Sequence, residues 1–198
     1  MNIVLYSQRV DVVASYGERR DCADQMLPKF LRQCGVLPMP LPNVPQLVDE
    51  ILSAINPRGI FLSGGNDLGS ATERDQTEKL LLDWAIENNR PVFGICRGMQ
   101  FIANYFGADI STVNNHVRTR HKISGVINRD GVNSFHNFGL LEVPDCFEVL
   151  GRADDHSVEA IRHKKFKIAA VGWHPERESP FNADDLYMIK NFFSGVRI

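Results

Sequence analysis

The feature of this sequence that points most directly to chemistry is a cysteine between two glycines, in the stretch Gly94-Ile95-Cys96-Arg97-Gly98. A short apolar run precedes Cys96 and an amphipathic pattern follows it, so the thiol lies on a predicted turn from a strand into a helix. Glycines on both sides permit the strained backbone that exposes a nucleophile on such a turn, and a helix N-terminus favours the thiolate. Cys96 is therefore a predicted nucleophile; the alternative is a buried cysteine in a glycine turn.

A second chemical group, Trp173-His174-Pro175-Glu176, follows another predicted strand. Pro175 cannot donate to a strand ladder, so it ends the strand and fixes a turn. Glu176 lies two residues after the histidine and can orient and stabilise an imidazolium, as the carboxylate of a triad does. Among the six histidines, His174 is the predicted general base, and a surface turn is the alternative.

The third motif is a Gly64-Gly65 loop at the end of a predicted strand, within "FLSGGNDLG" at residues 61–69. Such a loop can turn backbone N–H groups toward a developing oxyanion. The N–H of Arg97, directly after the nucleophile, is the second donor that the elbow geometry predicts. A Gly-Gly turn is common, so this motif is informative only beside the other two.

The elements that must position these motifs alternate along the first half of the chain. Strands are predicted at residues 2–6, 59–62 and 91–95, and helices at residues 21–34, 47–55, 73–88 and 98–106. Residues 36–42 contain three prolines and predict a short strand end or an extended connection. Several short strands are expected in residues 109–172, before a last helix. The β-α alternation predicts a parallel sheet covered on both faces, with ligands bound beyond the carboxyl ends of its strands.

The overall composition is that of an ordinary globular chain of 198 residues, 43% hydrophobic and 23% charged, which predicts one domain over residues 1–198. A net charge of −2 provides no general attraction to nucleic acid or anionic membrane. The N-terminus does not read as a signal peptide, and no apolar run predicts a membrane span. The four cysteines form no CxxC pair, so a reducing, cytoplasmic setting is expected.

The order of the three motifs resembles that of the class I glutamine amidotransferase superfamily, over nearly the whole chain. The resemblance implies a flavodoxin-like α/β/α sandwich with a mostly parallel central sheet. It also implies hydrolysis of a γ-glutamyl amide through a thioester, with Cys96 as nucleophile, His174 as general acid/base and Glu176 as its orienting partner. Gly65 and Arg97 would supply the oxyanion-hole amides. No cofactor and no metal ion are expected, because no cluster of metal ligands is visible in the sequence and thioester chemistry needs none.

Four further stretches, "GGNDL", "ERDQTE" (73–78), "GVNSFH" (131–136) and "VEAIRH" (158–163), resemble the γ-glutamyl hydrolase branch of this superfamily. That branch includes γ-glutamyl-γ-aminobutyrate hydrolases and acts without delivering ammonia to a synthase. The substrate-binding residues expected from these stretches and from the elbow helix are Gly64, Asn66, Gln100, Asn133, Ser134 and His136. For the last three, a polar turn is the alternative.

Three arginines, Arg9, Arg19 and Arg20, follow the first strand at the edge where ligands are expected. Guanidinium groups suit bidentate capture of phosphate or carboxylate; a solvated, charged helix start is the alternative. The stretches around them resemble amidotransferase-like hydrolases of surface-polysaccharide pathways. The resemblance implies a nucleotide-linked γ-glutamyl phosphoramidate as substrate, in capsular polysaccharide biosynthesis.

Two rival functions fit the same motifs. The chain could be a glutaminase that supplies ammonia to a partner synthase, although no synthase sequence is fused here and no obligatory synthase partner is expected. It could also be a non-catalytic regulator on the same scaffold. The presence of Cys96, His174 and Glu176 together argues against the regulator.

Overall fold

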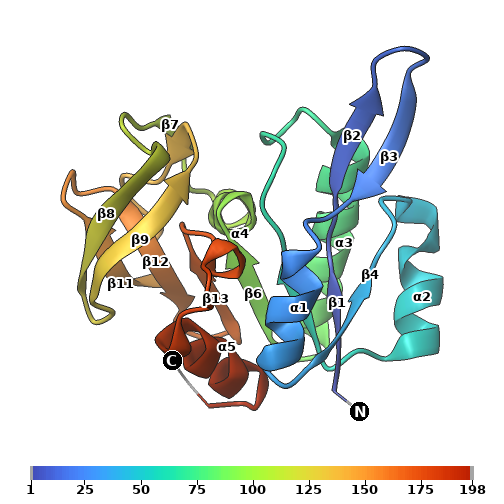
Figure 1. Cartoon of the computed structure of the whole chain (residues 1–198). Coiled ribbons are helices and arrows are strands. Elements are labelled where there is room, and N and C mark those ends of the chain that lie inside the picture. Colours follow the sequence, from blue (N-terminus) through green and yellow to red (C-terminus); the bar gives the residue numbers. More distant parts are fainter. Residues whose placement is uncertain (1, 197–198) are drawn as a thin grey trace.

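The computed structural model describes residues 2–196, and its main feature is a nine-stranded sheet in the order β4-β1-β5-β6-β13-β12-β11-β8-β9 (Figure 1). The first five strands in this order pair in parallel; they are β4 (Leu37–Pro40), β1 (Ile3–Tyr6), β5 (Gly59–Leu62), β6 (Val92–Ile95) and β13 (Ile168–Val171). The other four extend the sheet by antiparallel pairing; they are β12 (Val158–His163), β11 (Phe147–Ala153), β8 (Val117–Gly125) and β9 (Arg129–Phe135).

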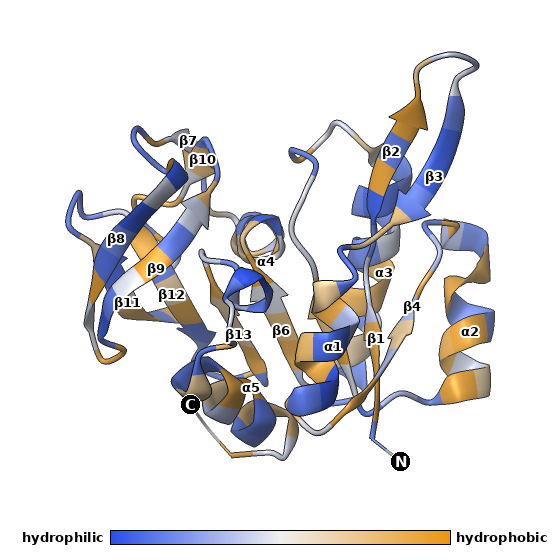
Figure 2. Cartoon of the chain, viewed as in Figure 1, coloured by the Kyte–Doolittle hydropathy of each residue, from blue (hydrophilic) through white to orange (hydrophobic). Residues whose placement is uncertain are grey.

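Helices cover both faces of the parallel strands. The helices are α1 (Met26–Gln33), α2 (Val48–Ile55), α3 (Thr72–Glu87), α4 (Arg97–Tyr105) and α5 (Ala183–Phe193). The buried residues of α1 and α5 pack in one core layer with Phe61 and Phe93, whereas those of α2, α3 and α4 pack in a second layer with Leu5 and Ile60. Apolar residues accordingly line the interior of the sandwich (Figure 2). The predicted α/β fold with parallel central strands is confirmed.

The parallel strands are short and apolar on both sides because helices bury both faces. All four residues of β5, β6 and β13 are buried. The proline-rich stretch became β4, which lies at the edge of the sheet, where a missing N–H leaves no neighbouring strand unpaired. Within residues 2–196, no helix is both long enough and apolar enough to cross a membrane.

The prediction of a helix from residue 21 was wrong at its start. Residues 9–22 form a hairpin of β2 (Arg9–Val13) and β3 (Glu18–Cys22), turned by Gly17 with a φ of 73°. The helix α1 begins at Met26, whose N–H donates to the Asp24 side chain at 2.8 Å. An acceptor of this kind satisfies a free amide of the first turn, which favours a helix start there rather than five residues earlier.

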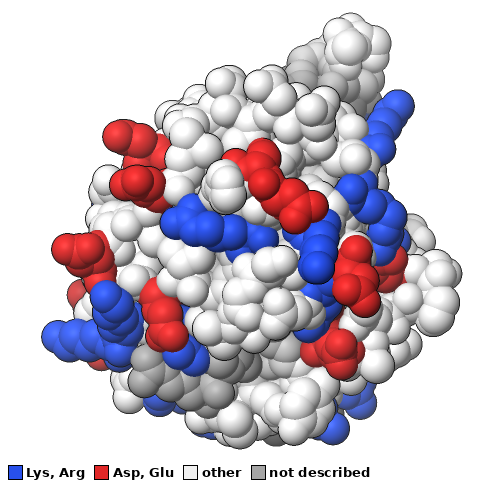
Figure 3. All heavy atoms as spheres, turned by 90° about the vertical axis from the view of Figure 1, so that its left-hand side faces the viewer, with Lys and Arg blue, Asp and Glu red and all other residues white. Residues whose placement is uncertain are grey.

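Residues 111–163 contain the antiparallel strands, including a small separate pair, β7 (Ser111–Thr112) and β10 (Phe138–Gly139). The short strands expected in this region are therefore present. The face on the side of these strands carries positive and negative side chains interspersed rather than a patch of one sign (Figure 3). Two short 3₁₀ helices, Pro45–Leu47 and Pro175–Arg177, complete the described elements.

Candidate active site

Cys96 occupies the turn between β6 and α4 with a φ of 50° and a ψ of −111°. A positive φ is uncommon in a residue other than glycine and has a cost in free energy, so packing must impose it. The N–H of Cys96 donates to the carbonyl of Val171 at 2.8 Å, which ties the turn to the end of β13. The strand-to-helix elbow predicted around Cys96 is present.

The flanking glycines are required by close backbone packing. A Cβ atom at Gly98 would lie 2.2 Å from the carbonyl oxygen of Leu62, and one at Gly94 would lie 2.7 Å from the carbonyl carbon of Gly98. The start of α4 therefore packs directly on the backbone of β5 and β6. This packing holds the elbow rigidly at the carboxyl ends of the central strands.

His174 lies against the elbow and is 2% exposed. Its side chain and that of Cys96 both face Gly64, where a Cβ atom would lie 3.2 Å from Nε2 of His174 and 3.5 Å from the Cβ of Cys96. Its Nδ1 lies 2.6 Å from Oε1 of Glu176. Burial lowers the pKa of His174, but the negative charges of the Cys96 thiolate and the Glu176 carboxylate outweigh that effect and raise the pKa to about 10. The geometry places a thiol beside a histidine that a carboxylate orients, an arrangement that suits nucleophilic attack on a carbonyl carbon.

Asn133 fixes the backbone of the histidine turn. Its Oδ1 accepts a hydrogen bond from the N–H of His174 at 2.9 Å, and its Nδ2 donates to the carbonyl of His174 at 2.8 Å and to Oε1 of Glu178 at 2.7 Å. The amide of this buried side chain is thus used within the protein. It positions His174 from β9, on the antiparallel side of the molecule.

The Gly64-Gly65 loop is fixed from beneath by Arg74 of α3. The Arg74 guanidinium donates to the carbonyls of Ser63 at 2.7 Å and Gly64 at 3.1 Å, and also to that of Gly65. In a trans peptide the carbonyl and the following N–H point in opposite directions. The N–H of Gly65 therefore points away from Arg74, toward the opposite side of the loop.

Arg74 belongs to a buried ionic network that the sequence motifs did not reveal. Glu78, fully buried, accepts from Nε of Arg74 at 2.9 Å and from the guanidinium of Arg97, which also pairs with Asp75. Burial raises the pKa of Glu78, but the two guanidinium groups hold it below its usual range. One carboxylate thus joins the glycine loop to the residue after Cys96. Arg74 and Glu78 are four residues apart on a predicted helix, and this spacing could have indicated an ion pair between them.

Two pockets are lined by residues of this centre. A pocket of about 290 Å³ is lined by Gly64, Gly65 and His174 and by the side chains of Arg9 and Arg177. This volume is near the lower end for small-molecule sites, about 300 Å³. Arg177, which the sequence motifs did not single out, follows Glu176 and stacks on the ring of Phe135 at 4.7 Å.

The second is a small pocket of about 10 Å³ lined by Cys96, Gln100 and His136, which is room for about one water molecule. Gln100 and His136 were both expected to bind substrate. Here Nε2 of Gln100 donates to the carbonyl of Phe138 at 2.6 Å, and Nδ1 of His136 lies 2.8 Å from the same carbonyl. Both side chains are next to the thiol, and each is engaged by β10.

Two other expected substrate-binding residues are used in the scaffold. Asn66 exchanges hydrogen bonds with the backbone N–H and carbonyl of Val10, at 2.8 and 2.9 Å, and so attaches the β2–β3 hairpin to the glycine loop. Ser134 is fully buried and donates to the carbonyl of His116 at 2.6 Å.

The three arginines near the N-terminus are separated by the hairpin. Arg9 packs over Gly65 at the pocket and pairs with Asp11. Neither Arg19 nor Arg20 lines that pocket; Arg19 pairs with Glu73, and Arg20 with Glu18 and Tyr16. Consecutive residues of a strand point to opposite faces, so these two side chains cannot face one ligand together.

Comparison with known proteins matches residues 20–196 to the family described as glutamine amidotransferase class-I. The chain is 32% identical to the γ-glutamyl-CDP-amidate hydrolase of Campylobacter jejuni, over 96% of this chain and 97% of that protein. It is 33% identical to a subunit of the glutamine-hydrolysing GMP synthase of Pyrococcus abyssi, over 83% of this chain and 88% of that protein.

Solved structures share the fold. A Thermoplasma acidophilum protein described as a GMP synthase subunit has a TM-score of 0.74 at 23% identity, with 98% of this chain and 94% of that chain covered. A glutamine amidotransferase from Thermotoga maritima has a TM-score of 0.65 at 14% identity, with 96% and 81% covered. The match over residues 20–196 and the full-length relatives show that this chain belongs to the class I glutamine amidotransferase family, whose chemistry here is the hydrolysis of an amide.

Proposed function

We propose that the protein is a cysteine-dependent γ-glutamyl hydrolase with Cys96, His174 and Glu176 as its catalytic residues. The observation that carries the proposal is the strained turn at Cys96, whose side chain faces the same glycine, Gly64, as a histidine held at 2.6 Å by a carboxylate. Strain of this kind concentrates at functional sites because the surrounding structure must maintain it.

The reaction proceeds in two steps, formation of the thioester and its hydrolysis. The Cys96 thiolate attacks the γ-carbonyl carbon, a carbon–sulfur bond forms, and the negative charge moves to the carbonyl oxygen. His174 donates its proton to the leaving nitrogen as the carbon–nitrogen bond breaks, which leaves a γ-glutamyl thioester and a free amine. His174 then takes a proton from water, the hydroxide displaces the sulfur, and glutamate leaves.

The oxyanion formed in both steps has two candidate hydrogen-bond donors, the backbone N–H groups of Gly65 and Arg97. The hydrogen bonds from Arg74 to the loop carbonyls support this role for Gly65, because they direct its N–H to the opposite side. The Glu78 bridge fixes Arg97 and Arg74 relative to one another. Donors that are fixed before the reaction stabilise developing charge without reorganisation.

For the substrate, we favour a γ-glutamyl phosphoramidate joined to a nucleotide, of the γ-glutamyl-CDP-amidate type, in capsular polysaccharide biosynthesis. The name of the Campylobacter jejuni relative and the presence of Arg9 and Arg177 at the larger pocket support this choice. Arg9 pairs with Asp11 and Arg177 lies 3.7 Å from Glu176. An anionic leaving group can add charge-assisted hydrogen bonds to these guanidinium groups, whereas ammonia cannot. The relatives named as GMP synthase subunits favour a second candidate, a glutaminase that supplies ammonia to a partner synthase. A γ-glutamyl-γ-aminobutyrate-type hydrolase is the third.

The test compares kcat/KM on glutamine, γ-glutamyl-γ-aminobutyrate and a γ-glutamyl-phosphoramidate nucleotide. The nucleotide substrate should be hydrolysed fastest without any partner protein, and acid quenching should trap a glutamyl adduct on Cys96. Glutaminase activity that appears only on adding a synthase would favour the second candidate. An active Cys96→Ala variant would refute the covalent mechanism itself.

The arginines allow a matched comparison on one hairpin. Arg9→Ala should lower kcat/KM on the nucleotide substrate about tenfold, since one charge-assisted hydrogen bond contributes roughly 1.5 kcal/mol at an exposed site. The side chain of Arg9 is 46% exposed, which supports the lower end of that range. Arg20→Ala, on the same hairpin but outside the pocket, is the control and should leave kcat/KM unchanged on both substrates. Equal losses on glutamine and on the nucleotide would exclude phosphate recognition by Arg9.

A further inference from the structure

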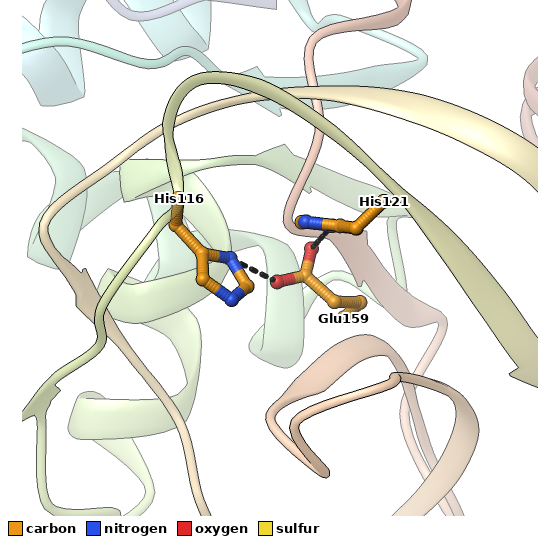
Figure 4. A group of neighbouring side chains, drawn as sticks. All are labelled: His116, His121 and Glu159. Atoms are coloured by element: carbon orange, nitrogen blue, oxygen red, sulfur yellow. Dashed lines mark ion pairs between the residues drawn. The ribbon is translucent and has the colours of Figure 1, made fainter.

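A second cluster of reactive side chains lies beside the proposed catalytic centre, where three histidines surround one buried carboxylate. Oε1 of Glu159 lies 3.4 Å from Nδ1 of His116 and 3.4 Å from Nε2 of His136, and Oε2 lies 3.7 Å from Nε2 of His121. Figure 4 shows the rings of His116 and His121 directed at the Glu159 carboxylate. Glu159 is 1% exposed, and within residues 2–196 the three facing ring nitrogens and Oε2 are buried without a directed hydrogen bond.

The outer hydrogen bonds of two of these rings decide where their protons lie. Nε2 of His116 is 2.9 Å from Oδ2 of Asp155, and Nδ1 of His136 is 2.8 Å from the carbonyl of Phe138. Carboxylate and carbonyl oxygens only accept, so each of these nitrogens carries the hydrogen. The inner nitrogen of each ring faces the Glu159 carboxylate. Two facing acceptors repel each other, and either a proton or a metal cation between them makes the contact favourable.

A local irregularity in β8 brings the two histidines together. His116 and His121 are five residues apart, so a regular strand would direct them to opposite faces. At Arg118, which has a φ of 54°, two steps along β8 pair with one step along β9. This bulge inserts one extra residue and turns both histidines to the same side, as bulges near functional sites commonly do.

We propose that His116, His121, His136 and Glu159 form a binding site for a divalent transition-metal ion of the zinc class. Imidazole nitrogens with one carboxylate oxygen are ligands that zinc prefers. Bonds of about 2.0–2.1 Å in a tetrahedron place neighbouring ligand atoms about 3.3–3.4 Å apart. Oε1 of Glu159 lies 3.4 Å from the facing nitrogens of His116 and His136, and Nε2 of His121 lies 3.7 Å from the other oxygen, Oε2. The donor atoms of His116, His121 and Glu159 all lie within 4.8 Å of one another.

Asp155 supports the site from outside. Metal-bound histidines commonly donate their other N–H to a carboxylate, which fixes the ring and raises its basicity. Asp155 holds His116 in this way and is itself held by the N–H and hydroxyl of Ser157, at 3.0 and 2.7 Å. The arrangement therefore extends beyond the ligands themselves.

The ion would join the antiparallel strands to the proposed catalytic turn. Glu159 lies on β12, and its carbonyl accepts from the N–H of Gly172 at 2.7 Å. A Cβ atom at Gly172 would lie 2.0 Å from Oε2 of Glu159, so the carboxylate rests on the backbone two residues before His174. The β8–β9 hairpin supplies the histidines and also Asn133, which fixes His174. The ion is thus a structural one that stabilises this contact.

The test measures bound metal in protein purified without an affinity tag and without chelator. The unmodified chain should retain about one zinc per molecule, and chelator-stripped protein should regain zinc with a rise in melting temperature. Glu159→Gln and His121→Ala should each retain less than about a tenth of an equivalent. Asp155→Asn should weaken zinc affinity by roughly 10- to 100-fold. His156→Asn removes an exposed histidine outside the cluster and should bind zinc normally.

The thiol of Cys96 is a competing site, so Cys96→Ser separates the two. Retention of zinc by Cys96→Ser supports the proposed cluster, and loss of zinc in that variant overturns it. The proposal also fails when the unmodified chain binds none of zinc, cobalt or nickel, or when Glu159→Gln binds as tightly as the unmodified chain. Should Glu159→Gln fail to fold, His121→Ala decides the matter, because its ring is partly exposed. None of these measurements depends on the substrate.

Discussion

A single methyl group at Gly64 should disable the proposed catalytic centre while leaving the fold intact. A Cβ atom there would lie 2.5 Å from Cε1 and 3.2 Å from Nε2 of His174, and 3.5 Å from the Cβ of Cys96. Carbon atoms in contact are ordinarily about 3.5–4.0 Å apart. In Gly64→Ala the loop and the His174 ring must therefore separate by about 1 Å. A misplacement of that size costs about 100-fold in rate.

The loss should appear in kcat, because the ring that transfers the proton moves. Stability should change little. Gly64 does not have a left-handed φ, and an alanine at such a position restricts the unfolded chain by about 0.4–1 kcal/mol, which offsets part of the strain. The assay is steady-state hydrolysis of the preferred γ-glutamyl substrate, with thermal melting measured on the same samples.

Two other glycines serve as controls. Gly131→Ala, on β9, adds a methyl group whose nearest neighbour is the Arg120 side chain at 3.7 Å, so activity and melting temperature should both be preserved. In Gly98→Ala the new atom would meet the backbone oxygen of Leu62 at 2.2 Å, so the fold should lose about 1–3 kcal/mol or more. Normal turnover by a folded Gly64→Ala variant would show that the contact between this loop and His174 has no part in catalysis.

Three further perturbations test the surroundings of the centre. The pKa of His174 is raised to about 10. The stability from its ionised state is therefore fully present below about pH 6.5 and is lost as pH rises through 10, and NMR of the ring should show this titration. Cys96→Ala should lower the pKa of His174, because the charge of Cys96 contributes most to raising it. Asn133→Ala leaves the buried N–H of His174 without its partner, whereas the carbonyl of His174 keeps the N–H of Arg177 at 3.1 Å. The cost should be about 1–3 kcal/mol. Both kcat and the denaturant midpoint should fall, and an unchanged kcat would contradict its positioning role. Glu78→Gln leaves two buried guanidinium groups without their shared carboxylate, and should cost about 3–5 kcal/mol of stability, seen as a melting temperature lower by about 6–20 °C.

The sequence alone was enough to predict the turns on which the proposed catalytic residues lie. Gly94 and Gly98 around Cys96 predicted a sharp turn, and the structure has that turn because no Cβ atom fits at either glycine. His174 and Glu176 are two residues apart across a proline, so their contact is local and could be predicted from their order. The alternation of short apolar runs with amphipathic helices likewise determined the parallel half of the sheet, because hydrophobic period is a local property.

The contacts between distant segments were decided only by the tertiary structure. Charged residues at 18–22 looked like a helix start, yet they pair with β2, which leaves Arg9 alone of the three N-terminal arginines at the pocket. Arg74 reaches the glycine loop because α3 packs beneath that loop. The local sequence pattern cannot show which distant segment a buried guanidinium will contact.

The histidine cluster was also beyond the reach of the sequence. The separations between His116, His121, His136 and Glu159 match no short ligand motif, and alternation along a strand places the first two on opposite faces. One extra residue at Arg118 reverses that alternation, and antiparallel pairing then brings β8, β9 and β12 around one carboxylate. Sequence order determines local turns and periods, whereas register and packing determine which side chains from separate strands meet.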